Sequence, residues 1–216
     1  MSATVGRRLR IGAAIAVAAA IGVGLGLGVH SLIGGPADAG AGIPLPQVRG
    51  QAVWPQGVRK APEFSLLDSH SKRFTLASLR GEPVVIVFMD SRCHQECPLI
   101  GRALAAGFKL VPKRDRPTVV AVSVDPWEDT PGSVQRAIKR FGLSGFRWRW
   151  LLGTKAQLAP IWRKYRIQVR RTPGDVEHTD ALYLVDSKGY ERAGMVYPFL
   201  PTWVATDLKT LAAESG

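Results

Sequence analysis

The sequence predicts an α/β domain, a three-layer α/β/α sandwich with helices on both faces of a largely parallel sheet. Two apolar runs, 84–89 and 118–124, have the length and β-branched content of strands buried on both faces. Between them, residues 97–110 carry apolar side chains at helical spacing, and the order strand, helix, strand implies a right-handed parallel crossover. With 216 residues, 46% of them hydrophobic, the chain can build one core of ordinary size.

Further elements are expected on both sides of this unit. Two apolar segments, 61–68 and 74–79, flank polar turn residues ahead of the first buried run, and Pro131 opens a second helix that reaches Phe141. The remaining expected elements are a short strand at 148–152, a helix at 155–165, a hairpin of 181–186 with 192–196 that turns at 187–189, and a helix at 201–213. Two crossovers, a hairpin and a C-terminal helix are the layout of a thioredoxin-like fold.

An uncharged run at 11–29 precedes the predicted domain and follows three arginines, Arg7, Arg8 and Arg10. About 20 apolar residues are what a bilayer-spanning helix needs, and the basic flank should stay in the cytoplasm. We therefore expect a single-pass anchor in the cell membrane, with the C-terminal domain extracytoplasmic. A cleaved signal peptide is the alternative, because Ala37-Asp38-Ala39 is typical of a cleavage site.

A flexible tether is expected between the anchor and the domain, because residues 36–55 are rich in Gly, Pro and Ala without a helical or strand period. The predicted organisation is a cytoplasmic basic flank at 1–10, a transmembrane anchor or signal peptide at 11–29, a flexible linker at 30–58 and one thioredoxin-like domain at 59–216.

The formal net charge of +12 does not by itself indicate nucleic-acid binding. Single-stranded nucleic acid is usually bound by basic side chains on one face with aromatic residues between them. The densest basic run consists of Arg163, Lys164, Arg166, Arg170 and Arg171. Tyr165 is the one aromatic residue within it. We interpret this run as a solvated basic face, with an anionic lipid surface or an acidic protein partner as the alternative, and expect no nucleic-acid partner.

Two cysteines, Cys93 and Cys97, are expected to carry the chemistry. They are too few for a disulfide scaffold and too close together to link distant parts of a fold. They follow a buried strand and open a helix, where unpaired N–H groups and the helix dipole favour a thiolate. Such a pair can close a disulfide or bind one metal ion, and soft sulfur ligands favour Cu(I), while an added imidazole also suits Cu(II).

A metal site would need a ligand beyond two thiolates, and four histidines are available. His178 lies in a loop that enters a strand and could reach the cysteines, although a surface or packing role is the more common one for a lone histidine. His94 should point away from the pair, His70 belongs to a surface turn, and His30 receives no role. Asp125 could tune the site, although a turn residue that bonds local N–H groups is the simpler interpretation.

Three spaced motifs together resemble the Sco (SenC) family of copper chaperones. They are Phe88-x-Asp-Ser-x-Cys93-x-x-x-Cys97-Pro98, then Val122-Ser-Val-Asp125-Pro126 with Asp129-Thr130-Pro131, then His178-Thr179 leading into Tyr183-Leu-Val-Asp186-x-x-Gly189. The resemblance spans 61–194 and implies a thioredoxin fold in which Cys93, Cys97 and His178 bind one copper ion. It also implies a partner, the copper-site subunit of cytochrome c oxidase or another cuproprotein acceptor. Glu177 departs from the pattern, which usually has aspartate there.

A second function remains open, that of an extracytoplasmic thiol-disulfide oxidoreductase that cycles Cys93 and Cys97 against thiol-disulfide partners. The three-residue gap between the cysteines favours copper, because disulfide exchangers usually have two intervening residues. A peroxiredoxin is disfavoured, since Asp90 stands where that motif has threonine. Whether the protein is an enzyme is therefore left open at this point.

Overall fold

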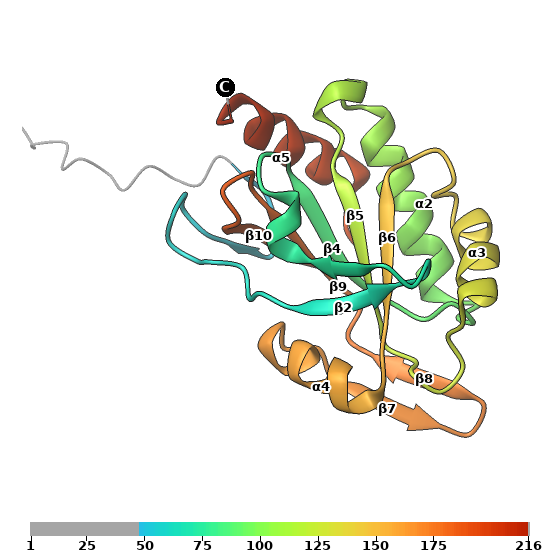
Figure 1. The fold of residues 1–216 in the computed structure, drawn as a ribbon. Helices are drawn as coiled ribbons and strands as arrows, with labels where there is room; N and C mark the ends of the chain where they lie inside the picture. Colours follow the sequence, from blue (N-terminus) through green and yellow to red (C-terminus); the bar gives the residue numbers. More distant parts are fainter. Residues whose placement is uncertain (1–47, 216) are drawn as a thin grey trace, which may run out of the picture. The chain divides into compact units, whose positions relative to one another are not determined.

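An eight-stranded mixed sheet organises residues 48–215, the part of the chain that the computed structural model describes (Figure 1). In spatial order its strands are β1 (Ala52–Val53), β10 (Glu191–Val196), β9 (Ala181–Val185), β4 (Val84–Met89), β5 (Thr118–Ser123), β6 (Trp148–Leu152), β2 (Ser65–Asp68) and β3 (Arg73–Thr75). Strands β4, β5 and β6 are parallel to one another, whereas β9 is antiparallel to β4. The predicted thioredoxin-like sandwich is confirmed.

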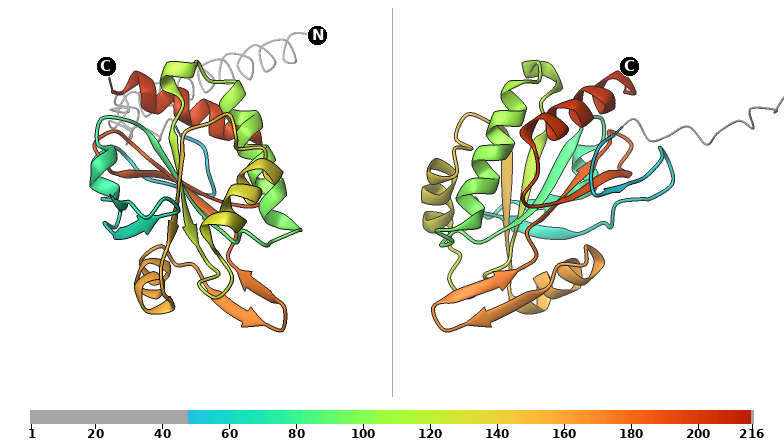
Figure 2. Two further views of the ribbon diagram at one scale, coloured as in Figure 1. Left: turned by 45° about the vertical axis from the view of Figure 1, so that its right-hand side comes forward. Right: turned by 180° about the vertical axis from the view of Figure 1, so that it is seen from behind.

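Helices cover both faces of this sheet (Figure 2). One core cluster packs α2 (Glu96–Lys109), α3 (Pro131–Arg140) and α5 (Pro201–Ala213) against the sheet, and the other cluster includes residues of α4 (Lys155–Lys164). Alternate residues of β4 divide between the clusters: Val85, Val87 and Met89 face the first, and the residues between them face the second. This alternation explains why the β4 sequence is apolar throughout.

The helix starts follow local capping chemistry. Thr130 accepts a hydrogen bond from the N–H of Ser133 at the start of α3, and Thr154 accepts one from Gln157 at the start of α4. Reciprocal bonds of this kind satisfy N–H groups that the first turn of a helix leaves free. Pro131 occupies the first turn of α3, as predicted, where its missing N–H costs nothing.

Two strands that the sequence patterns did not indicate form a separate hairpin, β7 (Val169–Thr172) with β8 (Asp175–His178). The loop predicted to carry His178 into a strand is instead part of this hairpin, with His178 as the last residue of β8. Pro173-Gly174 lies between the strands, and Gly174 adopts a positive φ of 79°, a conformation that glycine permits. The turn is therefore a signal that sequence inspection could have used.

The range predicted as a flexible linker includes residues that join the sheet. Strand β1 pairs with β10, and Val48 is buried in the first core cluster. The predicted span at 11–29, its basic flank and the first part of the linker lie outside the described residues. Within 48–215, no helix combines the length and apolar character that a bilayer crossing requires.

Gly101 sets how closely α2 approaches the end of α3, and we predict that Gly101→Ala destabilises the fold. A Cβ at this position would lie 2.6 Å from the backbone oxygen of Phe141. Such overpacking costs about 1–3 kcal/mol and outweighs the roughly 1 kcal/mol by which alanine favours a helix over glycine. Thermal unfolding should show a lower Tm for Gly101→Ala.

Gly132→Ala is the matched control, because a Cβ there would meet only the end of the flexible Arg136 side chain, at 3.6 Å. Its Tm should be unchanged or higher. An equal loss of stability in both variants would contradict the importance of the close approach at Gly101.

Candidate metal centre

The two cysteines lie at the carboxyl end of β4, where the chain leaves the sheet and enters α2. Cys97 is fully buried in the first turn of α2, and Cys93 is half-buried in the loop before it. The helix begins at Glu96, so Cys93 is not itself part of a helical face shared with Cys97. The chain nevertheless brings the two together, since the N–H of Cys97 donates a hydrogen bond to Sγ of Cys93 at 3.3 Å.

Side chains from neighbouring elements fix the loop that carries Cys93. The guanidinium of Arg140, at the end of α3, donates to the carbonyl oxygens of Ser91 and Cys93 at 2.7 and 3.0 Å. The carboxylate of Asp129 accepts from the N–H of Ser91 at 2.9 Å and from the hydroxyl of Ser123 at 2.6 Å. The position of Cys93 therefore depends on α3 and on the loop after β5, not only on its own helix.

The surroundings of the two thiols shift their pKa values in opposite directions. A hydrogen bond from the thiol of Cys97, helped by the N–H groups of Cys97 and Gln95, lowers the pKa of Cys93 to about 7 against the opposing effect of burial. The same thiol–thiol hydrogen bond, together with burial, raises the pKa of Cys97 well above its ordinary value. Cys93 is therefore the thiol that ionises first and the stronger nucleophile at neutral pH.

This difference predicts selective alkylation of the reduced, metal-free protein. Because only the thiolate reacts, the rate with iodoacetamide should rise with pH around a midpoint of about 7, and mass spectrometry should place the label on Cys93. Cys93→Ser should react only slowly, since the remaining thiol is buried and protonated. A midpoint at about 8.5, the value of a free thiol, would contradict the role of the Cys97 hydrogen bond.

His178 reaches the cysteines because the hairpin β7–β8 extends from the carboxyl end of the sheet (Figure 1). It is the last residue of β8, its side chain is only 5% exposed, and Nε2 lies 3.9 Å from Sγ of Cys97. On the other side of the ring, Nδ1 is 3.2 Å from the carbonyl oxygen of Thr179 and 3.7 Å from Oδ1 of Asp180. A proton on Nδ1 would be donated to that carbonyl, which leaves the lone pair of Nε2 facing the thiol.

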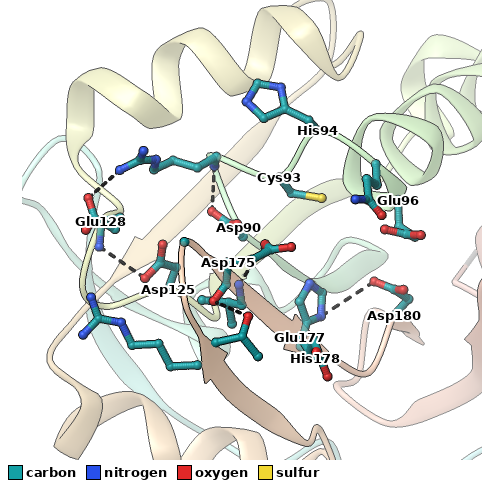
Figure 3. Close-up of a pocket in the computed structure, with 16 residues that line it drawn as sticks. Asp90, Cys93, His94, Glu96, Asp125, Glu128, Asp175, Glu177, His178 and Asp180 are labelled. Carbon is teal, nitrogen blue, oxygen red and sulfur yellow. Dashed lines mark hydrogen bonds and ion pairs between the residues drawn. The ribbon is translucent and has the colours of Figure 1, made fainter.

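Cys93 and His178, but not the buried Cys97, line a cavity of about 560 Å³, which we call the cysteine cavity (Figure 3). Its lining is dominated by carboxylates, since it contains two arginines, Arg92 and Arg171, against seven acidic residues: Asp90, Glu96, Asp125, Glu128, Asp175, Glu177 and Asp180. Two of the seven are paired, Glu128 with Arg92 and Glu177 with Arg170. The cavity is thus acidic in a strongly basic protein.

Three carboxylates, those of Asp90, Asp125 and Asp129, have oxygen atoms within 4.8 Å of one another. Burial raises the pKa of each, that of Asp129 to about 7. The ligand atoms of Cys93, Cys97 and His178 do not all meet the same spacing. The dithiol–imidazole set is therefore open, and its three ligand atoms would have to move closer together to complete a three-ligand site.

The remaining candidates from the sequence occupy surface or turn positions. His70 is 54% exposed beside Asp68, and His94 is exposed at the rim of the cavity with its ring directed away from Cys93 (Figure 3). Asp125 accepts hydrogen bonds from the N–H groups of Trp127 and Glu128, as the turn interpretation predicted. The five basic residues at 163–171 are exposed along the end of α4 and β7.

Sequence reasoning missed Arg140, Asp90 and Asp180. Asp90 and Asp180 are close in sequence to Cys93 and His178, and that proximity was the one available signal. Arg140 lies 47 residues from Cys93, and no motif connects the two.

The fold and this site define a class: a thioredoxin-like protein with a Cys-x-x-x-Cys pair and a histidine brought to it from a distant hairpin. The SCO1/SenC family pattern matches residues 55–213, and the chain belongs to this family. Among curated proteins it is similar to the mitochondrial SCO2 homologue of Mus musculus, with 30% identity over 136 residues, 59% of this chain and 52% of that protein. The chain therefore spans about half the length of that relative.

Solved structures show the same fold. Copper-bound ScoI of Bradyrhizobium japonicum superimposes with a TM-score of 0.61 at 28% identity, over 70% of this chain and 99% of that one. BsSco, described as a member of the Sco family of cytochrome c oxidase assembly proteins and as having a disulfide switch, gives a TM-score of 0.62 at 21% identity, over 76% of this chain and 98% of its own. At 21% identity, the similarity to BsSco supports the fold of this chain and nothing more.

Proposed function

We propose that this chain is a copper chaperone that binds one copper ion through Cys93, Cys97 and His178 and delivers it to the copper-site subunit of cytochrome c oxidase or to another cuproprotein acceptor. The observation that carries the proposal is the 3.9 Å approach of His178 Nε2 to Cys97 Sγ, because these residues are 81 positions apart in the chain. Membership of the SCO1/SenC family and the copper-bound relative support the choice of metal.

The donor set suits this cargo. Two thiolates are soft ligands for Cu(I), and a neutral imidazole adds a third donor that also suits Cu(II). Cys93, with its pKa of about 7, supplies one thiolate readily, whereas Cys97 must lose its proton when the metal binds. Binding therefore releases protons, and the apparent affinity should weaken as pH falls.

The open arrangement suits transfer. An acceptor must add its own ligand to the ion before the chaperone ligands leave, and a closed four-ligand cage would obstruct this shared intermediate. The cysteine cavity leaves such a path beside Cys93. An N-terminal anchor at 11–29 would hold the domain on the extracytoplasmic side of the cell membrane, where an acceptor embedded in the same membrane is within reach.

The deciding experiment is copper titration of the reduced full-length chain in neutral detergent, wild type beside His178→Ala. The wild type should bind one copper per chain. His178→Ala should retain Cu(I) on the two sulfurs with a modest loss of affinity, but should lose Cu(II) affinity by roughly a hundredfold, since nitrogen ligation matters more for Cu(II).

His70→Ala and His94→Ala are the matched controls and should bind both oxidation states as the wild type does. Unchanged Cu(I) and Cu(II) affinities in His178→Ala, together with intact disulfide exchange, would favour the second function instead.

That second function is a thiol-disulfide oxidoreductase, and one observation favours it. The lowered pKa of Cys93 and the raised pKa of buried Cys97 resemble the division between an attacking and a resolving thiol. Disulfide exchange does not need an imidazole beside Cys97. The close approach of His178 therefore makes copper binding the better supported proposal.

A further inference from the structure

The hairpin that carries His178 is not part of the main sheet. Among the described strands, β7 and β8 pair only with each other, and the hairpin stands apart from the eight-stranded sheet (Figure 2). Within 48–215, the hydrogen bonds and ion pairs of residues 169–178 end within 168–180, apart from the contact of His178 with Cys97. Side-chain packing, and not backbone pairing, therefore sets the place of the hairpin against the rest of the domain.

One face of the hairpin makes that packing. Val169 lies opposite His178 in the strand pair, and Arg171 lies opposite Val176. Directly opposed residues have their side chains on the same side, and so do alternate residues of one strand, so these four side chains share a face. The face is turned toward the domain, because Val176 is 9% exposed in the second core cluster and the side chain of His178 is 5% exposed.

Trp127, in the loop after β5, contacts this face of the hairpin. The guanidinium of Arg171 lies 4.9 Å from the centroid of the Trp127 ring, and the ammonium of Lys155, the first residue of α4, lies 5.8 Å from it. A cation over an aromatic face is attracted by the ring, most strongly when the ring is tryptophan. The neighbouring Arg170 pairs with Glu177 inside the hairpin and so holds nothing outside it. Trp127 therefore joins the hairpin to the start of α4.

Trp127 is itself held in place. Its N–H donates to Oδ1 of Asp125 at 3.1 Å, and its side chain packs against the second core cluster. The turn that carries it is closed by the N–H of Asp129, which donates to the carbonyl oxygen of Asp125 at 3.0 Å. A hairpin face that contacts Trp127 at one point and Cys97 at another cannot rotate about its long axis without breaking one of the two contacts.

We propose that Trp127 is a positioning residue, which holds the β7–β8 hairpin so that the imidazole of His178 stays beside Cys97. This inference rests on the proposed function, because it takes His178 as a copper ligand. A ligand that is already in place when the ion arrives loses less conformational freedom on binding, which raises affinity. Loss of the Trp127 contact should therefore weaken ligation by His178 and leave the two thiolates unaffected.

The first test titrates copper into the reduced full-length chain in neutral detergent. It compares Trp127→Leu, which keeps an apolar side chain without an aromatic face, with Trp127→Phe, which keeps an aromatic ring. Trp127→Leu should bind Cu(II) about fivefold more weakly, as expected for the loss of one exposed cation–π contact, and should bind Cu(I) as the wild type does. Trp127→Phe should restore most of the Cu(II) affinity.

A second background shows whether Trp127 acts through the imidazole. When Trp127→Leu is combined with His178→Ala, the double variant should bind Cu(II) no more weakly than His178→Ala alone, because the ligand that Trp127 positions is gone. A further loss of Cu(II) affinity in the double variant would overturn the inference.

The matched control is Trp54→Leu. The guanidinium of Arg59 lies 4.4 Å from the centroid of the Trp54 ring, so this variant also removes a cation–π contact. The N–H of Trp54 donates to the carbonyl oxygen of Arg192, in the part of β10 that lies at the end of the sheet opposite the cysteines. Trp54→Leu should therefore bind Cu(II) as the wild type does. A loss equal to that of Trp127→Leu would contradict a specific role for Trp127.

Hydrogen–deuterium exchange of the reduced, copper-free chain tests the same inference without copper. Trp127→Leu should speed the exchange of the amides of β7 and β8 and leave those of β4 and β5, at the centre of the sheet, as they are in the wild type. Unchanged exchange in the hairpin, with one copper bound per wild-type chain, would overturn this inference and leave the chaperone function standing. A wild-type chain that binds no copper would overturn the proposed function and, with it, the role assigned to Trp127.

Discussion

Replacing Cys97 with serine should abolish specific Cu(I) binding, and Cys93→Ser should do the same. A serine hydroxyl is a hard, weakly acidic donor, so either variant leaves one thiolate and one imidazole for a soft ion. Four-ligand zinc sites bind with about 10–16 kcal/mol, or roughly 3 kcal/mol per ligand, and a loss of that size weakens binding at least about a hundredfold. Competition with a calibrated Cu(I) chelator measures the change.

The size of this effect depends on how the structure uses each cysteine. Cys97 faces His178 from inside the core, and Cys93 completes the set from the loop. His94→Ala is the control, because it changes a potential ligand in the same loop without touching the dithiol. Retention of tight, one-to-one Cu(I) binding by Cys97→Ser would place the copper site elsewhere on the chain.

Oxidation of the metal-free protein should close an intramolecular Cys93–Cys97 disulfide and abolish copper uptake. The two thiols already share a hydrogen bond, and a disulfide offers no thiolate to a metal. Mass spectrometry should show the loss of two hydrogen atoms from the peptide that contains both cysteines. Titration of the oxidised chain should then show no one-to-one copper binding.

Reduction of the same sample should restore binding, which excludes irreversible damage as the cause. Copper already bound to the thiolates should in turn slow their oxidation. Equal copper affinities of the oxidised and reduced chains would show that the dithiol is not the site.

Much of the fold could be predicted from the sequence because its signals are local. The apolar runs of β4 and β5 have no polar face, which indicates burial on both sides, and the capping threonines and Pro131 mark helix starts within one turn. The order of these elements then limits the sheet to a parallel centre with a terminal hairpin. The elements that local patterns missed, β1 and the hairpin β7–β8, are short or polar and are held by pairing with a partner strand.

The sequence by itself also determined the reactive pair, because Cys93 and Cys97 follow a buried strand and lie at a helix start, and it selected His178 only through a family resemblance. The tertiary structure decided the rest. The 3.9 Å contact of His178 with Cys97, the support of Arg140 for the cysteine loop and the acidic lining of the cavity all join residues from different elements. The physical reason is that hydrophobic periodicity and helix capping depend only on residues a few positions apart in the sequence. A site at the end of a sheet is instead assembled by pairing between distant strands, which brings separate loops to one place.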